Sequence, residues 1–179
     1  MASDQLPDTI DPWKYCQSGR ELKLTLDQAL FKRASEMLVE VKGQMEFELQ
    51  FDMDPQRQPF VKGHLRGEAV LTCQRCLQPM TAPLDDDFIW GLVRSEEAAE
   101  NLPRLYEPVM IEDEKLDLMS VLEDELILAL PVVALHPEEV CQLTLSEKAR
   151  LEEAPKADDA SENPFSALAD LKRSLQSKQ

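Results

Sequence analysis

Two cysteines separated by two residues, Cys73-Gln-Arg-Cys76, are the residues whose types and spacing most clearly permit chemistry. This spacing can place two sulfurs around one metal ion or in one redox pair. A thioredoxin-like redox site requires its first cysteine at an exposed helix N-terminus within a βαβ unit. Here the pair follows a predicted hairpin strand and precedes Pro79, so the context disfavours redox catalysis.

A tetrahedral zinc site would need two ligands in addition to this pair. His136 and Cys141 form the best second pair, which makes Cys73, Cys76, His136 and Cys141 the candidate metal set. The spacing His-x-x-x-x-Cys is less common as a second half than Cys-x-x-Cys. The alternative is that the cysteines fill small buried sites, as free cysteines often do. The remaining cysteine and histidine are Cys16 and His64.

Arg75 lies between the two cysteines of the pair. A guanidinium in a tight turn can bind carbonyl oxygens or hold a phosphate through two hydrogen bonds. Together with Arg57, Lys62 and Arg66 on the predicted hairpin, Arg75 forms a candidate basic patch for contact with RNA or with a protein partner.

Two acidic runs, Asp85-Asp86-Asp87 and Glu123-Asp124-Glu125, could in principle hold a divalent cation or perform acid–base chemistry. Runs of like charge are more often solvated faces of helices or strands, and we interpret both runs in this way. The sequence also has only two histidines, no glycine-rich phosphate loop and no Gly-x-Ser-x-Gly elbow. We therefore expect a protein that is not an enzyme.

The chain of 179 residues has a net charge of −16, from 35 acidic and 19 basic residues. Such a field repels phosphate backbones and attracts basic partners, although net charge also serves solubility alone. The segment 11–75 has ten acidic and ten basic residues, whereas 85–125 has fourteen acidic and three basic. No apolar run approaches the roughly 20 residues that cross a bilayer, so we expect a cytoplasmic protein without membrane contact.

The predicted fold class is α+β, with an antiparallel sheet built on a central hairpin and covered by one or two helices. Strict alternation of apolar and polar residues over 44–52 predicts the first hairpin strand, and 60–72 the second. Further strands are predicted at 21–26, 80–93 and 106–111. Helices are predicted at 28–38, after Ser95, and from Asp117 to Leu130, where Glu123, Asp124 and Glu125 mark the polar side.

Four parts are predicted along the chain. They are an extended arm at 1–20, the α+β domain at 21–146, an acidic flexible linker at 147–162, and a short amphipathic helix with a tail at 163–179. This tethered C-terminal helix would need a surface, either on its own domain or in a partner's groove. Its apolar positions are Phe165, Leu168, Leu171 and Leu175.

Three of these segments resemble the YceD family, large ribosomal RNA subunit accumulation protein. They are Cys73-Gln-Arg-Cys76-Leu77, the segment 117–131 with His136 and Cys141 beyond it, and the Asn-Pro-Phe-Ser-Ala-Leu sequence at 163–168. The resemblance implies a role in the synthesis, processing or stability of large-subunit (23S) ribosomal RNA, with no known catalytic activity. It also implies that some relatives complete a metal site with a further cysteine-rich segment, where this sequence has only His136 and Cys141.

The charge of the chain favours one mechanism for such a role. A protein this acidic is expected to hold a basic ribosomal protein or an rRNA-processing factor, because broad RNA binding requires a clustered basic surface. The competing mechanism is a local RNA contact at the basic patch of Arg57, Lys62, Arg66 and Arg75. A structural zinc protein or a redox sensor that uses the Cys-x-x-Cys pair is the alternative class.

Overall fold

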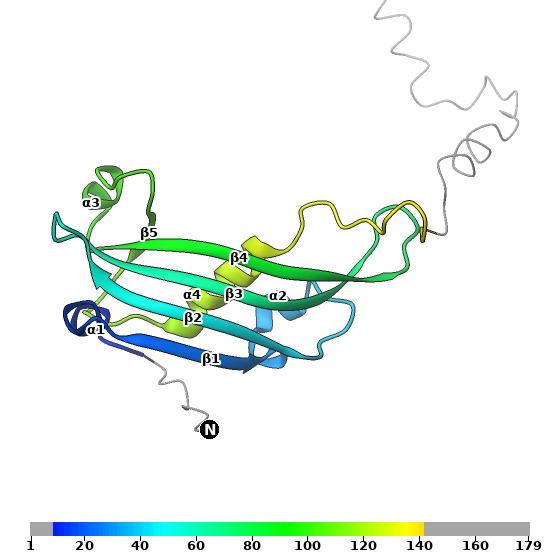
Figure 1. The fold of residues 1–179 in the computed structure, drawn as a ribbon, viewed down its shortest axis with the longest axis horizontal. Coiled ribbons are helices and arrows are strands. Elements are labelled where there is room, and N and C mark those ends of the chain that lie inside the picture. Colours follow the sequence, from blue (N-terminus) through cyan, green and yellow to red (C-terminus); the bar gives the residue numbers. More distant parts are fainter. Residues whose placement is uncertain (1–8, 142–179) are drawn as a thin grey trace, which may run out of the picture. The chain divides into compact units, whose positions relative to one another are not determined.

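The computed structural model describes residues 9–141, which belong to one compact unit (Figure 1). The predicted linker (147–162) and the predicted C-terminal helix and tail (163–179) lie outside the described residues.

One sheet dominates the described part of the chain. It contains β1 (Glu21–Asp27), β2 (Gln44–Met53), β3 (Pro59–Thr72), β4 (Pro79–Val93) and β5 (Glu107–Met110), in the order β1-β2-β3-β4-β5. The first four strands pair antiparallel, and β5 pairs parallel with β4. The predicted α+β class and its central hairpin are therefore confirmed.

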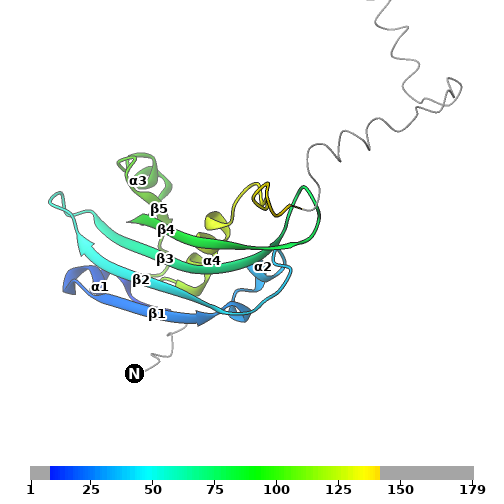
Figure 2. The ribbon, with the colours of Figure 1, turned by 45° about the vertical axis from the view of Figure 1, so that its right-hand side comes forward.

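The alternating residues of β2 explain which face of the sheet is buried. Met45, Phe47, Leu49 and Phe51 are each at most 2% exposed, because side chains two apart in a strand point to the same face. The helix α4 (Leu118–Ala129) packs against this face and buries Leu118, Leu122 and Leu126 (Figures 1 and 2).

Both ends of α4 are encoded locally. The carboxylate of Asp117 accepts a hydrogen bond from the backbone N–H of Ser120 at 3.1 Å, as an N-cap does. The helix stops before Pro131, because the residue that precedes a proline is forced towards extended conformations, and Leu130 has ψ 136°. No helix within residues 9–141 is long and apolar enough to cross a membrane.

The acidic run on α4 is not a solvated face, so that prediction was wrong for two of its three residues. Glu123 and Glu125 are buried, whereas Asp124 is exposed. Glu125 accepts a hydrogen bond from the indole Nε1 of Trp90 at 2.6 Å. Glu123 accepts hydrogen bonds from the backbone N–H and the guanidinium Nε of Arg33, at 2.6 and 2.8 Å. Both carboxylates are buried because specific donors meet them.

The predicted helix over 28–38 is also interrupted. A short 3₁₀ helix, η1 (Gln28–Leu30), is followed by the single turn α2 (Lys32–Ser35). Phe31 separates them with φ −91° and ψ 88°, and its side chain is fully buried. Burial of this ring and of Gln28 in the core overrides the helical spacing of the sequence.

The N-terminal segment is helical in part, so the predicted extended arm was wrong there. The helix α1 (Pro12–Ser18) begins after Asp11, whose carboxylate accepts a hydrogen bond from the backbone N–H of Lys14. A proline at the first helical position is favourable, because its missing N–H would have no helical partner. Gly19 ends the helix in the left-handed conformation at φ 60°. A second short helix, α3 (Glu96–Glu100), is capped by Ser95 as predicted.

Candidate metal site

A tight turn at the end of the central hairpin positions the Cys-x-x-Cys pair. We call residues 73–78 the knuckle. The backbone N–H of Leu77 donates to the carbonyl oxygen of Cys73 at 2.9 Å, and that of Cys73 donates to the carbonyl of Gln78 at 2.9 Å. Leu77 has a positive φ of 60°, which lets the chain reverse within these residues. Cys73 and Cys76 are buried on the inside of this turn.

The chain that leaves α4 runs alongside the knuckle, and we call residues 131–141 the exit segment. The backbone N–H of Gln74 donates to the carbonyl oxygen of Ala134 at 2.8 Å, and its side-chain Nε2 donates to that of Val132 at 3.2 Å. Pro131 breaks the helix and so allows this extended course. Backbone hydrogen bonds therefore join two segments that lie far apart in the sequence.

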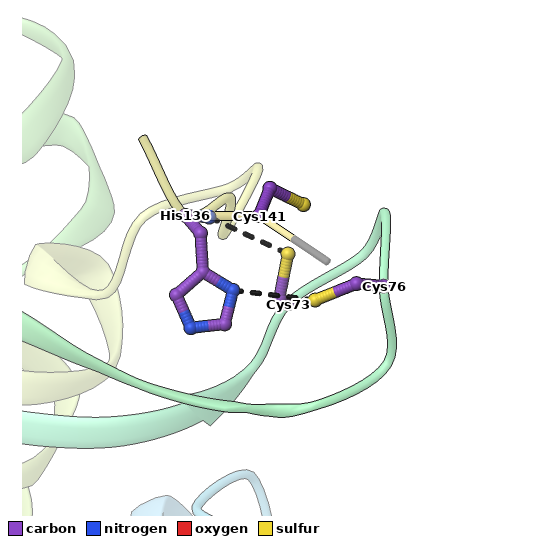
Figure 3. A group of neighbouring side chains, drawn as sticks. All are labelled: Cys73, Cys76, His136 and Cys141. Carbon is purple, nitrogen blue, oxygen red and sulfur yellow. Dashed lines mark hydrogen bonds between the residues drawn. The ribbon is translucent and has the colours of Figure 1, made fainter. Parts of the chain in front are cut away.

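The knuckle and the exit segment together bring four potential ligands into one cluster. One ligand atom from each of Cys73, Cys76, His136 and Cys141 lies within 4.8 Å of the others. His136 Nδ1 lies 3.3 Å from Cys76 Sγ, and the backbone N–H of His136 donates to Cys73 Sγ at 3.4 Å (Figure 3). The structure thus assembles the four residues that the sequence spacing singled out, and the cluster could hold a metal ion.

The other ring nitrogen of His136 is held by the hairpin. Nε2 lies 3.1 Å from the carbonyl oxygen of Pro79, which can accept a hydrogen bond from a protonated Nε2. That tautomer leaves the lone pair of Nδ1 directed at the sulfurs. Histidine ligands of metals are commonly oriented by such a second hydrogen bond. The orienting role of Pro79 was not predicted from the sequence.

The electrostatics of the cluster favour thiolates. Burial raises the pKa of Cys73, but hydrogen bonds from the backbone N–H groups of Cys76, His136 and Arg75 outweigh it and lower the pKa to about 5. The pKa of Cys76 is lowered mainly by the backbone N–H of Gln78. The pKa of His136 is raised by its hydrogen bonds to Cys73 and Cys76. Deprotonated sulfurs are the form that binds metal ions.

Cys16 and His64, the other residues of these types, lie outside the cluster. The thiol of Cys16 donates to the carbonyl oxygen of Phe60 at 3.5 Å, and burial raises its pKa to about 11, so it behaves as an inert core thiol. The ring of His64 lies between the carboxylates of Asp85 and Asp87, at 3.3 and 2.9 Å.

The four residues of the predicted basic patch do not lie together. Arg57 is in the turn before β3, whereas Arg75 is in the knuckle beyond the opposite end of that strand. Lys62 and Arg66 lie between them on the exposed face of β3. The guanidinium of Arg66 lies 3.5 Å from the carboxylate of Asp85. The hairpin therefore offers cations that are separated from one another, and the contact roles of these four residues remain a prediction.

Three carboxylates lie near Glu125 of α4, and we call the four residues the acidic edge. They are Asp86 of β4, Glu107 of β5, and Asp124 and Glu125 of α4. Burial raises the pKa of Glu125 to about 6, with further contributions from Glu107, Asp86 and Asp124. The other three carboxylates are thus close enough to Glu125 to disfavour its charged form. The sequence showed the excess of acid in this region but not the parallel pairing of β5 that brings Glu107 to it.

Comparison with known proteins identifies one family. The family model described as large ribosomal RNA subunit accumulation protein YceD matches residues 61–172. A curated protein of that description from Haemophilus influenzae is 33% identical over 174 residues, which cover 97% of this chain and 99% of the relative. No solved structure matches the chain.

Proposed function

Because the chain belongs to the YceD family of large ribosomal RNA subunit accumulation proteins, we propose that it supports accumulation of 23S ribosomal RNA as a cytoplasmic ribosome-biogenesis factor. The family description names an effect on RNA and no chemical reaction. We propose that the protein acts by binding rather than by catalysis.

The proposed partner is a basic ribosomal protein or an rRNA-processing factor. Residues 9–141 contain 26 acidic and 13 basic residues, a net charge of −13. The acidic edge concentrates part of this charge, and the exposed carboxylates there can stand in for RNA phosphates until the basic protein reaches its RNA. The gathering of the exposed carboxylates of Asp86, Glu107 and Asp124 around the buried Glu125 is the single observation that supports this proposal best, because a bound cationic side chain would meet several carboxylates at once.

Contact with RNA is proposed to be local or indirect. Arg66 has acidic cross-strand neighbours, Glu46 on β2 and Asp85 on β4, whereas Lys62 faces Gln50 and Ile89. Such a surface does not provide the clustered positive charge that tracks a phosphate backbone. Arg57, Lys62, Arg66 and Arg75 remain candidates for single contacts.

Capture of partners with and without nuclease separates these two mechanisms. The tagged full chain should retain basic ribosomal proteins or processing factors after complete digestion of RNA. Loss of all partners on digestion would show that RNA itself holds them, and would overturn the proposal.

We also propose that the cluster of Cys73, Cys76, His136 and Cys141 binds zinc in a structural role. Three sulfurs and one imidazole nitrogen are a ligand set of closed structural zinc sites, which need four ligands and no open position. The observation that favours this proposal is the convergence of the four ligand atoms within 4.8 Å. A redox sensor is the competing use of the same thiols.

Metal analysis of the purified chain tests this second proposal. About one zinc ion per chain is expected in the wild type. Cys73→Ser should lose the metal, while Cys16→Ala, which removes a buried thiol outside the cluster, should keep it. A wild-type chain purified without chelator that holds no zinc, and whose thiols oxidise reversibly with peroxide, would support the redox sensor instead.

A further inference from the structure

An apolar groove of about 460 Å³ lies beside the candidate metal site. Its lining contains no charged residue, and several of its side chains are strongly exposed: Val132 by 92%, Leu77 by 71% and Met37 by 52%. Proteins rarely expose large apolar side chains in a contiguous group without a partner for them. This concentration of exposed apolar side chains marks the groove as an interaction surface.

The walls of the groove come from the two segments that the cluster joins. Leu77 and Gln74 belong to the knuckle, and Val132 belongs to the exit segment. Ile127 near the end of α4, Met37 after α2, and Leu71 and Thr72 at the end of β3 line it as well. A metal ion at the cluster would cross-link the knuckle and the exit segment, both of which line this groove.

The charges around the groove point to a basic occupant. Glu36 is exposed next to Met37 of the lining, and Glu138 and Glu139 are exposed on the exit segment, whereas Asp124 on α4 is already paired with Arg33 at 2.6 Å. The described chain as a whole carries a net charge of −13. A second copy of this acidic chain would meet like charge at the same rim, which disfavours self-association.

We propose that this groove docks the apolar face of a basic amphipathic helix of a partner protein, and that metal at the cluster holds the groove in its binding form. The proposal rests on the proposed function, since it names a place where a basic partner binds. A helix with apolar residues at i, i+3, i+4 and i+7 presents one apolar stripe to such a groove. Lysine and arginine on its flanks would then reach the acidic rim.

The test uses the full chain and a synthetic amphipathic helix of leucine and lysine as the probe. Titration followed by nuclear magnetic resonance should show shifts at Met37, Leu77 and Val132. A scrambled peptide of the same composition, and a leucine–glutamate peptide with the same apolar stripe, should bind at least about ten-fold more weakly. Equal binding of the scrambled peptide, or shifts confined to the acidic edge, would overturn the proposal.

Matched variants separate the groove from general charge attraction. Val132→Asp should weaken binding of the lysine peptide by about ten-fold or more. Leu105→Asp is the control, because Leu105 is 67% exposed, does not line the groove and receives the same added charge. Removal of zinc, with the resonances of the sheet unchanged, should weaken binding to a similar extent. Unchanged binding by the zinc-free chain would contradict the metal dependence.

Failure of the groove proposal can be distinguished from failure of the proposed function. If Val132→Asp retains every basic partner in the nuclease-treated capture, the groove is not their docking site although the function stands. If the wild type retains none, the proposed function fails whatever the peptide does.

Discussion

His136 Nδ1 lies 3.3 Å from Cys76 Sγ, although 60 residues separate the two in the sequence. This contact joins the hairpin to the segment that follows α4. His136→Ala should therefore reduce bound zinc strongly and lower the melting temperature, because a four-ligand structural site loses one ligand. His64→Ala is the control, since His64 lies outside the cluster. Equal zinc content in wild type and His136→Ala would contradict the assignment of this ligand.

Replacement of Glu125 should stabilise the protein. Its folded pKa of about 6 lies above the ordinary 4.5, so the stability it contributes is full below pH 4.5 and is lost as the pH rises through 6. Glu125→Gln can still accept the hydrogen bond of Trp90 without the buried charge. We expect a gain of up to about 2 kcal/mol at pH 7, measured by urea unfolding, and a smaller difference at pH 4.5. A loss of stability at pH 7 would contradict this account.

The hydrogen-bonded carboxylate of Glu123 predicts a pH dependence of stability opposite to that of Glu125. Burial alone would raise its pKa, but the side chain of Arg33 and the backbone N–H groups of Ala34 and Arg33 lower it below the ordinary value. The stability it contributes is therefore present above its unfolded pKa and is lost as the pH falls through the folded one.

Arg33→Ala should accordingly lower the stability at pH 7, measured by urea unfolding, because it leaves a buried carboxylate without its cation. Lys23→Ala removes only the exposed ion pair with Glu48 and should lower the stability clearly less than Arg33→Ala does. Equal losses in the two variants would show that the burial of Glu123 has no energetic consequence.

The strands could be predicted from the sequence because the alternation of residues along each strand shows which of its faces is buried. The alternation of Met45, Phe47, Leu49 and Phe51 requires only one buried face, and that face exists. The interruption at Phe31 could not be predicted, since its cause is the core that receives the ring and not the local spacing.

The candidate site, too, could be predicted from the sequence only in part. The ligand types and spacing identified Cys73, Cys76, His136 and Cys141, but only the fold shows that the exit segment returns to the knuckle. The reverse holds for Arg57 and Arg75, which are close in sequence yet lie beyond opposite ends of β3. The buried positions of Glu123 and Glu125 escaped prediction because their donors, Arg33 and Trp90, come from distant segments.

Charge reversal at the acidic edge tests most directly whether carboxylates hold a basic partner. The full chain with Asp86→Lys and Glu107→Lys is compared with a chain carrying Glu96→Lys and Glu97→Lys, which makes the same charge change at exposed positions of α3. After nuclease digestion, the first pair should lose basic ribosomal proteins or processing factors by about ten-fold, and the second should keep them. Equal retention by both variants would contradict the account.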